Sequence, residues 1–271
     1  MFGRLGNEAF TATKNNVDVL GNIIENVSNV NSIGYKKGQI SFVETLNGEI
    51  SKQENKDFSQ GPLRKTGDIF DFALDGPGFF EVELPSGQRA YTRAGRFRLS
   101  SEGELVTLEE GYRVIPGVEQ QEKPVVEANN IGNNDLGLNI KVTTPKLIIP
   151  SDVVPEILED GTVNGINSVT GEKAKIGKIN VVVFNNPQGL ESVNKGYFLP
   201  AQSSGPPQDI EVGPNTASKV KQGFLEFGNV DIATEFLKLS QVKNILSAQL
   251  KLLKTIDKIH EQANYTIAKS V

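Results

Sequence analysis

The last part of the chain, residues 231–268, decides the fold and reads DIATEFLKLSQVKNILSAQLKLLKTIDKIHEQANYTIA. It contains neither Pro nor Gly, and its apolar residues recur with a seven-residue period, which predicts one long amphipathic helix. At a rise of about 1.5 Å per residue, this helix would reach roughly 57 Å, too long to be buried inside a small domain. The predicted apolar seam consists of Ile232, Phe236, Leu239, Val242, Leu246, Leu250, Leu253 and Ile256.

The first 33 residues predict a second helix with a similar seam. Its apolar residues recur at seven, with further ones three positions later, which is typical of a coiled-coil face. Gly34 can adopt the left-handed geometry that ends helices, so we expect the helix to stop near residues 31–34. The predicted seam, interrupted by Thr13, consists of Phe10, Val17, Leu20, Ile24 and Val27.

The middle of the chain has the pattern of an all-β domain. Short runs rich in Val, Ile, Phe and Tyr, such as 79–84, 112–115 and 179–184, each precede residues that favour turns. These runs predict strands joined by hairpins. Residues 123–138 are polar and Asn-rich, and we expect them to form a long surface loop.

The predicted fold class is therefore α+β, with a central all-β domain between two terminal helices that pair as a coiled-coil-like arm. The C-terminal helix is the longer one, which leaves an overhang for another subunit. An isolated helix with one apolar stripe is marginally stable in water, so we expect further copies of the chain to cover these seams. The expected segments are an N-terminal helix (1–33), an extended linker (34–67), the β domain (68–200), a return linker (201–228) and a C-terminal helix (229–271).

The composition argues against several functional classes. Without cysteine, the chain cannot form disulfides, zinc–thiolate sites or iron–sulfur clusters. A net charge of −5 argues against nucleic-acid binding and against adsorption to anionic lipid. No apolar stretch approaches the roughly 18 residues that cross a bilayer, so we expect no membrane insertion. We predict no catalytic, cofactor-binding or metal-binding residue.

Three motifs favour structural over chemical roles. Residues 76–78, Gly-Pro-Gly, lack the third Gly and the following helix of a phosphate-binding loop, so a plain turn is expected. His260 has no second His or Cys to help hold a metal, and we expect it to pack on the helix or to be partly exposed. The adjacent acids Glu109 and Glu110 would not converge on a substrate, and a solvated turn is expected there.

Several separated segments resemble one family. Residues 26–36, NVSNVNSIGYK, closely resemble the N-terminal signature of flagellar basal-body rod and hook proteins, and residues 222–231, QGFLEFGNVD, resemble their C-terminal signature. Residues 71–80, 91–97 and 103–107 resemble the start of the family's β domain, so the resemblance covers nearly the whole chain in the right order. The residues expected to form an assembly signature are Asn26, Asn29, Asn31, Gly34, Tyr35, Lys36, Gly223, Leu225, Glu226, Asn229, Val230, Asp231 and Glu235.

The chain also departs from the family pattern. Residues 17–22 resemble a family segment but stand three residues too far upstream, and Glu25 occupies a position where Asn is usual. Gly228 replaces the usual Ser, and Asn244 and Leu246 replace the family's Arg-x-Tyr. These changes indicate a divergent member of the family.

The resemblance implies a structural, non-enzymatic subunit of the flagellar basal-body rod, in the cell envelope or periplasm. Its helices would line a hollow helical shaft that transmits torque. The implied partners are other copies, other rod and hook proteins and the flagellar type III export apparatus, with the P- and L-ring proteins as further candidates. The start of the chain lacks the basic segment and apolar run of a secretory signal, so we expect export without a cleaved signal peptide.

Two alternatives and two further expectations remain. A hook or hook-like axial subunit would share these signatures, and a less favoured alternative is a β-domain protein that binds or hydrolyses peptidoglycan. The Asn cluster at 26, 29 and 31 is expected to end the helix, and one of its amides is a candidate for a bond between subunits. In the free monomer we expect the helices to be largely disordered, so that proteolysis releases a core of roughly residues 66–200.

Overall fold

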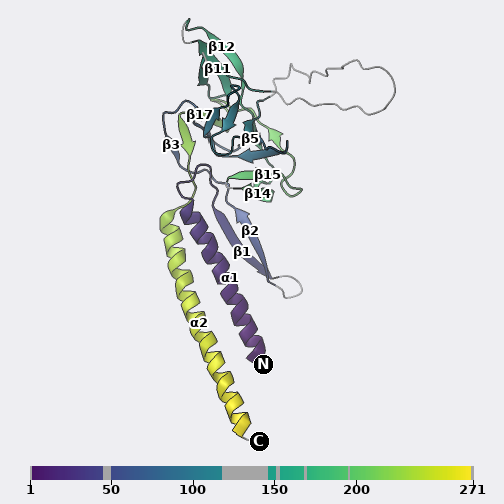
Figure 1. The fold of residues 1–271 in the computed structure, drawn as a ribbon, viewed down its shortest axis with the longest axis vertical. Coiled ribbons are helices and arrows are strands. Elements are labelled where there is room, and N and C mark those ends of the chain that lie inside the picture. The colour runs from purple at the N-terminus through teal and green to yellow at the C-terminus, as the bar shows by residue number, and fades with distance from the viewer. Residues whose placement is uncertain are drawn as a thin grey trace, which may run out of the picture. The chain divides into compact units, whose positions relative to one another are not determined.

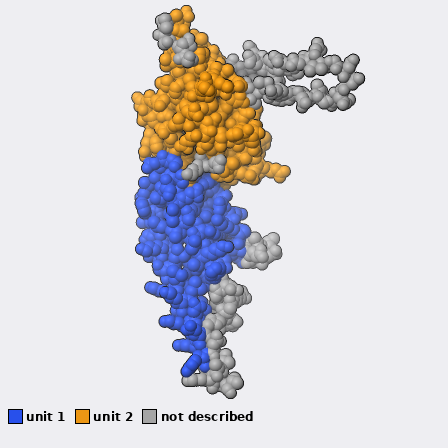
Figure 2. All heavy atoms as spheres, in the orientation of Figure 1, with its two compact units in different colours: residues 1–32, 36–59, 228–271 blue, residues 33–35, 60–227 orange. Residues whose placement is uncertain are grey.

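The computed structural model describes residues 2–44, 50–117, 146–150, 153–167, 170–194 and 196–269. The surface loop expected at 123–138 lies outside the described residues. The chain divides into two compact units, which have different colours in Figure 2. The segments of the two units alternate along the sequence. Unit 1 consists of residues 1–32, 36–59 and 228–271, and unit 2 consists of residues 33–35 and 60–227.

Unit 1 contains two helices and one β-hairpin (Figure 1). The helices α1 and α2 lie side by side and run antiparallel, because Asn16 of α1 bonds Gln249 whereas Asn26, farther along α1, bonds Glu235. The elements are α1 (Phe2–Ser28), β1 (Gly38–Glu44), β2 (Ile50–Lys56) and α2 (Ile232–Lys269).

The first helix ends earlier than the sequence predicts. α1 stops at Ser28, and residues 29–32 continue as hydrogen-bonded turns, in which the amide of Asn29 donates to the carbonyl of Asn26 at 3.2 Å. Gly34 has the positive φ expected of a residue that terminates a helix, +67°, but lies six residues beyond the end of α1. The Asn-rich sequence therefore forms a turn after the helix.

The hairpin β1–β2 lies within the segment 34–67, for which the sequence suggests an extended linker. Ion pairs hold it along α1: Lys52 of β2 lies 3.9 Å from Asp18, and Lys56 lies 3.5 Å from Glu25. Lys52 and Lys56 are four residues apart on the strand, and their partners are seven apart on the helix, so β2 runs in the direction of α1. Unit 1 is thus a hairpin packed on a helix pair.

Unit 2 is built almost entirely of short antiparallel strands. Within the described residues its main sheet has the order β14-β15-β6-β5-β9-β8-β7, with β13 pairing β5 and β16. Three smaller sheets are β10-β11-β12, β17-β4 and β18-β3. The strands are β3 (Leu63–Lys65), β4 (Phe72–Asp75), β5 (Phe79–Glu83), β6 (Arg89–Thr92), β7 (Phe97–Leu99), β8 (Leu105–Thr107), β9 (Arg113–Val114), β10 (Val153–Ile157), β11 (Thr162–Asn167), β12 (Lys173–Lys178), β13 (Val181–Val183), β14 (Glu191–Asn194), β15 (Tyr197–Leu199), β16 (Gln208–Asp209), β17 (Lys219–Gln222) and β18 (Phe224–Glu226), with the 3-10 helix η1 (Pro187–Gly189).

The three strands named from the sequence are confirmed, as β5, β9 and β13. The β5–β6 hairpin shows why: Gly87 takes a φ of +79° in the turn, and the amide of Leu84 donates to the carbonyl of Gln88 at 2.9 Å. Aromatic side chains then fill the interior of the unit, and the Phe80 ring stands edge-on to Phe97 at 5.5 Å. Turn residues and apolar runs thus fix this part of the fold.

The segment 201–228, expected as a return linker, supplies strands that complete unit 2. β16 pairs with β13, β17 pairs with β4, and β18 pairs with β3. Val220 and Leu225 from this segment are almost fully buried. The β unit therefore extends to residue 227.

The structure describes the positions of the three motifs for which the sequence favoured structural roles. Residues 76–78 form the turn between β4 and β5, and Glu109 and Glu110 lie exposed in the turn between β8 and β9. The backbone of His260 belongs to α2, but its side chain lies outside the description. The architecture is α+β, as predicted, and within the described residues neither helix is long and apolar enough to cross a membrane.

Candidate assembly site

The helix pair shows which face of each helix the chain itself covers. From Leu239 on, the less exposed residues of α2 recur at alternating intervals of three and four, as expected for a helix in contact with another. A set with the same spacing lies on α1, beside the residues that face the hairpin. Asn16 of α1 donates to Gln249 of α2 at 3.1 Å within this face. The face consists of Thr13, Asn16, Leu20, Ile23 and Val27 on α1 and of Leu239, Val242, Leu246, Gln249, Leu253 and Ile256 on α2.

The predicted seam of α1 therefore needs correction. Leu20 and Val27 belong to the covered face, but Phe10, Val17 and Ile24 are 66%, 52% and 53% exposed. The sequence placed all five on one seam because neighbouring stripes of a helix both repeat at seven. The covered face instead follows Ile23 and the amide-bearing residue Asn16. On α2, Ile232, Phe236 and Leu250 of the predicted seam are likewise about half exposed.

Two exposed apolar stripes with a seven-residue period lie on the helix pair, in addition to the exposed residues Ile232, Phe236, Leu237 and Leu250 of α2. We call Phe10, Val17 and Ile24 the N-stripe. The C-stripe, on α2, consists of Ile245, Leu252 and Ile259, whose exposed fractions lie between 41% and 52%. Sequence reasoning missed the C-stripe, although its seven-residue spacing was readable, because the stronger leucine repeat lies directly beside it.

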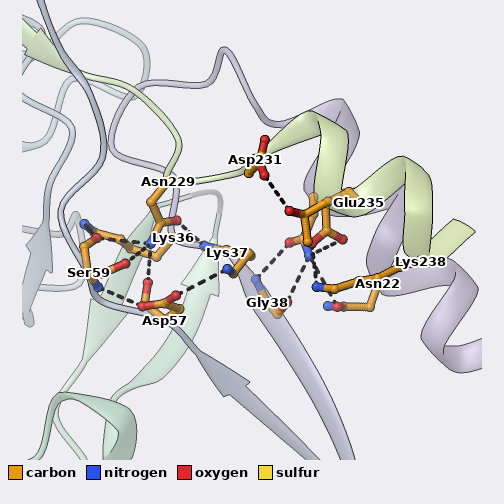
Figure 3. A network of polar contacts seen from close by, with 12 residues as sticks. Asn22, Lys36, Lys37, Gly38, Asp57, Ser59, Asn229, Asp231, Glu235 and Lys238 are labelled. Carbon is orange, nitrogen blue, oxygen red and sulfur yellow. Dashed lines mark hydrogen bonds and ion pairs between the residues drawn. The ribbon is translucent and has the colours of Figure 1, made fainter.

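A polar junction joins the elements of unit 1 where the two helices meet the hairpin (Figure 3). The side-chain amide of Asn26, almost fully buried, donates to the carbonyl of Gly38 at 2.9 Å and accepts from its amide at 2.8 Å. It thus pairs with β1 as a neighbouring strand would. A Cβ on residue 38 would lie 2.4 Å from the Asn22 side chain, so the glycine allows this close approach.

The start of α2 joins the same junction. Glu235 is 1% exposed and lies 3.5 Å from the Asn26 amide, while Lys238 donates to its carboxylate at 2.7 Å. Asp231 caps the helix by accepting from the amide of Ala233 at 3.2 Å. Hydrogen bonding from the Thr234 hydroxyl lowers the pKa of Asp231, so this carboxylate stays charged at the helix N-terminus.

Asn229 connects the two chain segments beside the hairpin. Its carbonyl oxygen accepts from the Lys37 amide at 2.7 Å, and its NH2 group donates to the Asp57 carbonyl at 2.8 Å and to the Ser59 carbonyl at 3.0 Å. The buried ammonium of Lys36 donates to the same Ser59 carbonyl at 2.7 Å. Signature residues from both ends of the sequence thus hold one small region together.

Lys37 and Asp57 belong to this junction but were missed from the sequence. Lys37 lies 3.4 Å from the Asp57 carboxylate. Burial pushes the pKa of Asp57 upward, but hydrogen bonds from Ser59 and the Lys37 cation outweigh it and leave the pKa below its usual value. No short motif could have identified this pair, because its residues are separated by the hairpin.

In unit 2, a buried ion pair holds the C-terminal signature. Glu226 accepts from Arg93 at 3.3 Å and from the Gly61 amide at 2.8 Å, and Arg93 also donates to the Gly76 carbonyl at 2.9 Å. Arg93 is 4% exposed and Glu226 is 1% exposed. Burial lowers the pKa of Arg93, while the Glu226 carboxylate opposes this shift by stabilising the cation.

Gly34 lies against the β domain in a position that excludes a side chain. A Cβ on this residue would lie 2.3 Å from the Ala94 nitrogen, and its φ of +67° already favours glycine. Its amide donates to the Glu226 carbonyl at 2.8 Å. Gly223 has a φ of +75° and donates to the Asp71 carbonyl at 2.7 Å.

The remaining signature residues differ in exposure. Tyr35, Leu225 and Val230 are buried. Asn29 donates to the Glu25 carbonyl of its own helix at 2.9 Å, and Asn31 is exposed. Most of the signature therefore stabilises the fold from inside, and Asn31 is a surface residue.

The described residues gather no chemical site. No group of three or more His, Cys, Asp or Glu side chains within the described ranges could hold a metal ion. The acids that are buried there, Asp71, Glu81, Glu226 and Glu235, all have hydrogen-bond partners within the protein. Among the described residues, we therefore take the two stripes as the candidate contact surface.

Comparison with known proteins decides the family. The chain is 30% identical over 268 residues to the flagellar basal-body rod protein FlgG of Buchnera aphidicola subsp. Schizaphis graminum, which covers 90% of this chain and 91% of the relative. It belongs to the flagellar basal-body rod protein family. FlgG of Bacillus subtilis is 29% identical with 91% of both chains covered, and FlgG of Borreliella burgdorferi is 28% identical with 94% of both covered.

A family model supports the same assignment. The model described as the flagellar hook protein FlgE/F/G D1 domain matches residues 73–165, a range that begins within β4 and ends within β11 of unit 2. Rod proteins are structural proteins, so the chain is not an enzyme. The expected resemblance to this family is confirmed.

One departure from the rod-protein pattern has a local structural reason. Gly228, where Ser is usual, packs against the turn after α1, and a Cβ there would lie 2.7 Å from the Asn29 carbonyl oxygen. The other departures have different settings: Glu25 pairs with Lys56 of the hairpin, Asn244 is exposed, and Leu246 lies in the covered helix face. The glycine lets the chain pass close to the end of α1.

Proposed function

We propose that this rod-family protein is a structural subunit of the bacterial flagellar basal-body rod, which assembles with copies of itself into a hollow helical shaft that transmits torque. The observation that carries the proposal is the exposure of two apolar stripes on a helix pair that has already covered its other apolar face. Membership of the rod-protein family supports it. Exposed apolar faces of this kind mark protein–protein contact surfaces.

The helix pair forms the assembly arm in this proposal, with the covered face as a short antiparallel coiled coil. The alternation of three and four along both helices supports this packing. α2 has 38 residues and α1 has 27, so the end of α2 is available to a neighbouring subunit. Contacts that run head to tail and do not close into a ring generate a helical polymer.

The signature residues act mainly by shaping the arm. Asn26, Glu235 and Asn229 fix the helix starts and ends to the hairpin, and Glu226 and Gly34 fix the β unit. The polar groups of Asn26 bond within the chain, so we propose the exposed Asn31 as the candidate for the cross-subunit amide suggested by the sequence. Self-assembly then depends on a surface whose geometry these buried groups set.

The partners in this proposal are other copies, other rod and hook proteins and the flagellar type III export apparatus, and the P- and L-ring proteins are further candidates. The site of action is the basal body in the cell envelope. A hook or hook-like role has less support, because the curated relatives above are named as rod proteins.

The decisive experiment deletes the gene and images isolated basal bodies. Deletion is expected to abolish swimming and to leave basal bodies with a truncated rod. A plasmid copy should restore both, whereas a copy with Val17→Ser and Ile24→Ser should be exported and folded without restoring the rod. Normal rods and swimming in the deletion strain would overturn the proposal.

A further inference from the structure

Gly21 lies in the middle of α1, and no close contact within the chain explains why a glycine occupies this position. Glycine is the least favourable residue inside a helix apart from proline. A Cβ on Gly21 would meet nothing within 4 Å, whereas a Cβ on Gly34, Gly38 or Gly228 would collide with the chain. The fold of one molecule therefore explains those three glycines but not Gly21.

Gly21 lies within the N-stripe, between Val17 four residues before it and Ile24 three residues after it. Both neighbours are about half exposed, so the glycine forms a shallow gap between two bulky apolar side chains. A missing side chain at such a place permits the close approach of another backbone or of a bulky side chain. The N-stripe is thus shaped to receive a partner.

The C-stripe has the complementary form. Ile245, Leu252 and Ile259 repeat at seven, as the N-stripe does, and the exposed small residues Ala248 and Thr255 alternate with them. Bulky side chains of one stripe can enter the gaps of the other, as in ridges-into-grooves packing. Both stripes adjoin the covered face, so contact between copies would extend an interface that already exists in the chain.

Resting on the proposed function, we propose that the N-stripe of one copy packs antiparallel against the C-stripe of a second copy, with Gly21 at the closest approach. In a polymer whose subunits all point the same way, the α2 of a neighbour runs antiparallel to α1, as it does within one chain. The pairing is heterologous and propagates from copy to copy.

The alternative pairing of two N-stripes is disfavoured by charge. Lys14 lies in the N-stripe between Phe10 and Val17, and a parallel pair of N-stripes would bring two Lys14 side chains together. Like charges at such spacing repel each other. The C-stripe instead presents the neutral residues Ala248 and Thr255 to that side.

Mixed cysteine cross-linking tests the pairing in the full chain. The protein contains no cysteine, so Val17→Cys and Leu252→Cys, made in separate chains with one carrying a size tag, each supply a single thiol. Under mild oxidation of the assembled mixture, the Val17–Leu252 heterodimer should form at least tenfold faster than a heterodimer of Val17→Cys with Ser247→Cys. Ser247 is exposed on α2 but lies off the C-stripe.

The outcomes separate this inference from the proposed function. If copies assemble but Val17–Val17 homodimers dominate, or the Ser247 control cross-links equally, the pairing is wrong while the rod proposal stands. If the wild-type chain forms no higher-order species by light scattering at any attainable concentration, with or without isolated rods as seeds, the proposed function itself fails.

Gly21→Ala tests the closest approach. This change should raise the melting temperature of the isolated chain, since alanine favours the helix and fits without contact. It should also raise the critical concentration for assembly at least several-fold. Ser247→Ala, an exposed change on α2 off the C-stripe, should leave that concentration unchanged. Unimpaired assembly of Gly21→Ala would overturn the role of Gly21.

Discussion

The polar junction and the apolar stripes of unit 1 differ in burial, in the opposite sense to their polarity. At the junction, charged and amide-bearing residues such as Asn26 and Glu235 are buried and bonded. On α1, by contrast, the apolar residues Phe10, Val17 and Ile24 are exposed. The family-like residues thus stabilise the fold of one molecule, and the exposed apolar residues are the ones that we propose to contact its partners. A sequence signature for assembly does not have to lie at the assembly surface.

Breaking the buried ion pair of unit 2 should give the largest effect on the isolated chain. Glu226→Gln leaves the buried Arg93 cation without its charged partner, and removing one partner of a buried pair costs about 3–5 kcal/mol. Urea denaturation followed by circular dichroism should show this loss. Glu156→Gln, which removes an exposed pair with Lys173, should cost less than about 0.5 kcal/mol. Equal losses in both variants would show that Arg93 finds another partner.

A side chain at Gly34 should have the next largest effect. Gly34→Ala combines a strained positive φ with a collision against the backbone of Ala94, and we expect a loss of about 2–4 kcal/mol in the free energy of unfolding. Gly67 has a similar φ of +80° with nothing within 4 Å of a Cβ. Gly67→Ala should therefore lose only the strain, roughly 1 kcal/mol. Equal stability of the two variants would show that the backbone near Ala94 can move to admit the new Cβ without a loss of stability, and it would contradict this prediction.

Much of the fold was readable from the sequence because it depends on local patterns. Apolar runs before turn residues identified β5, β9 and β13, and the absence of Pro and Gly identified α2. The covered face of α1 was not readable, because its helix carries two adjacent stripes with the same period. Which stripe is covered depends on the partner, α2, which follows about two hundred residues later.

The parts that were missed depend on contacts distant in sequence. The hairpin β1–β2 escaped detection because β2, ISKQENK, is almost wholly polar and its only apolar residue is Ile50. The pair Arg93–Glu226 joins residues 133 positions apart, and no local spacing predicts it. The same applies to β17 and β18, whose partners β4 and β3 lie at the start of the β unit. The β unit is therefore better placed at 60–227 than at 68–200. Because bonds within the chain join the helix pair to the hairpin, we now expect unit 1 to be folded in the free monomer as well, contrary to the expectation from the sequence.

Within the Asn cluster, Asn26 and Asn29 are expected to contribute differently to stability. Asn26→Ala would leave the buried amide and carbonyl of Gly38 without their partners, and we expect a loss of about 2–3 kcal/mol. Asn29→Ala removes a bond to the Glu25 carbonyl of its own helix and should change stability by less than about 0.5 kcal/mol. Thermal unfolding of the two variants measures this. Similar melting temperatures would contradict a structural role specific to Asn26.

The smallest effect on the isolated chain is the most informative one. Ile23 and Ile24 are neighbours on α1, but Ile23 is 2% exposed and Ile24 is 53% exposed. Ile23→Ala creates a cavity in the covered face and should cost about 2–4 kcal/mol. Ile24→Ala removes only exposed surface and should change the free energy of unfolding by less than about 0.5 kcal/mol.

For self-association, our proposal predicts the opposite ranking: Ile24→Ala should have the larger effect and Ile23→Ala the smaller one. Light scattering at matched concentrations of folded protein should show that Ile24→Ala impairs self-association, whereas Ile23→Ala, once folded at low temperature, retains it because the N-stripe is intact. Two side chains of the same type, one residue apart, then report separately on the fold of one molecule and on contact between copies. If Ile24→Ala assembled like the unaltered chain while Ile23→Ala did not, the exposed stripe would have no part in assembly, and the covered face of the helix pair would have to open for subunits to join.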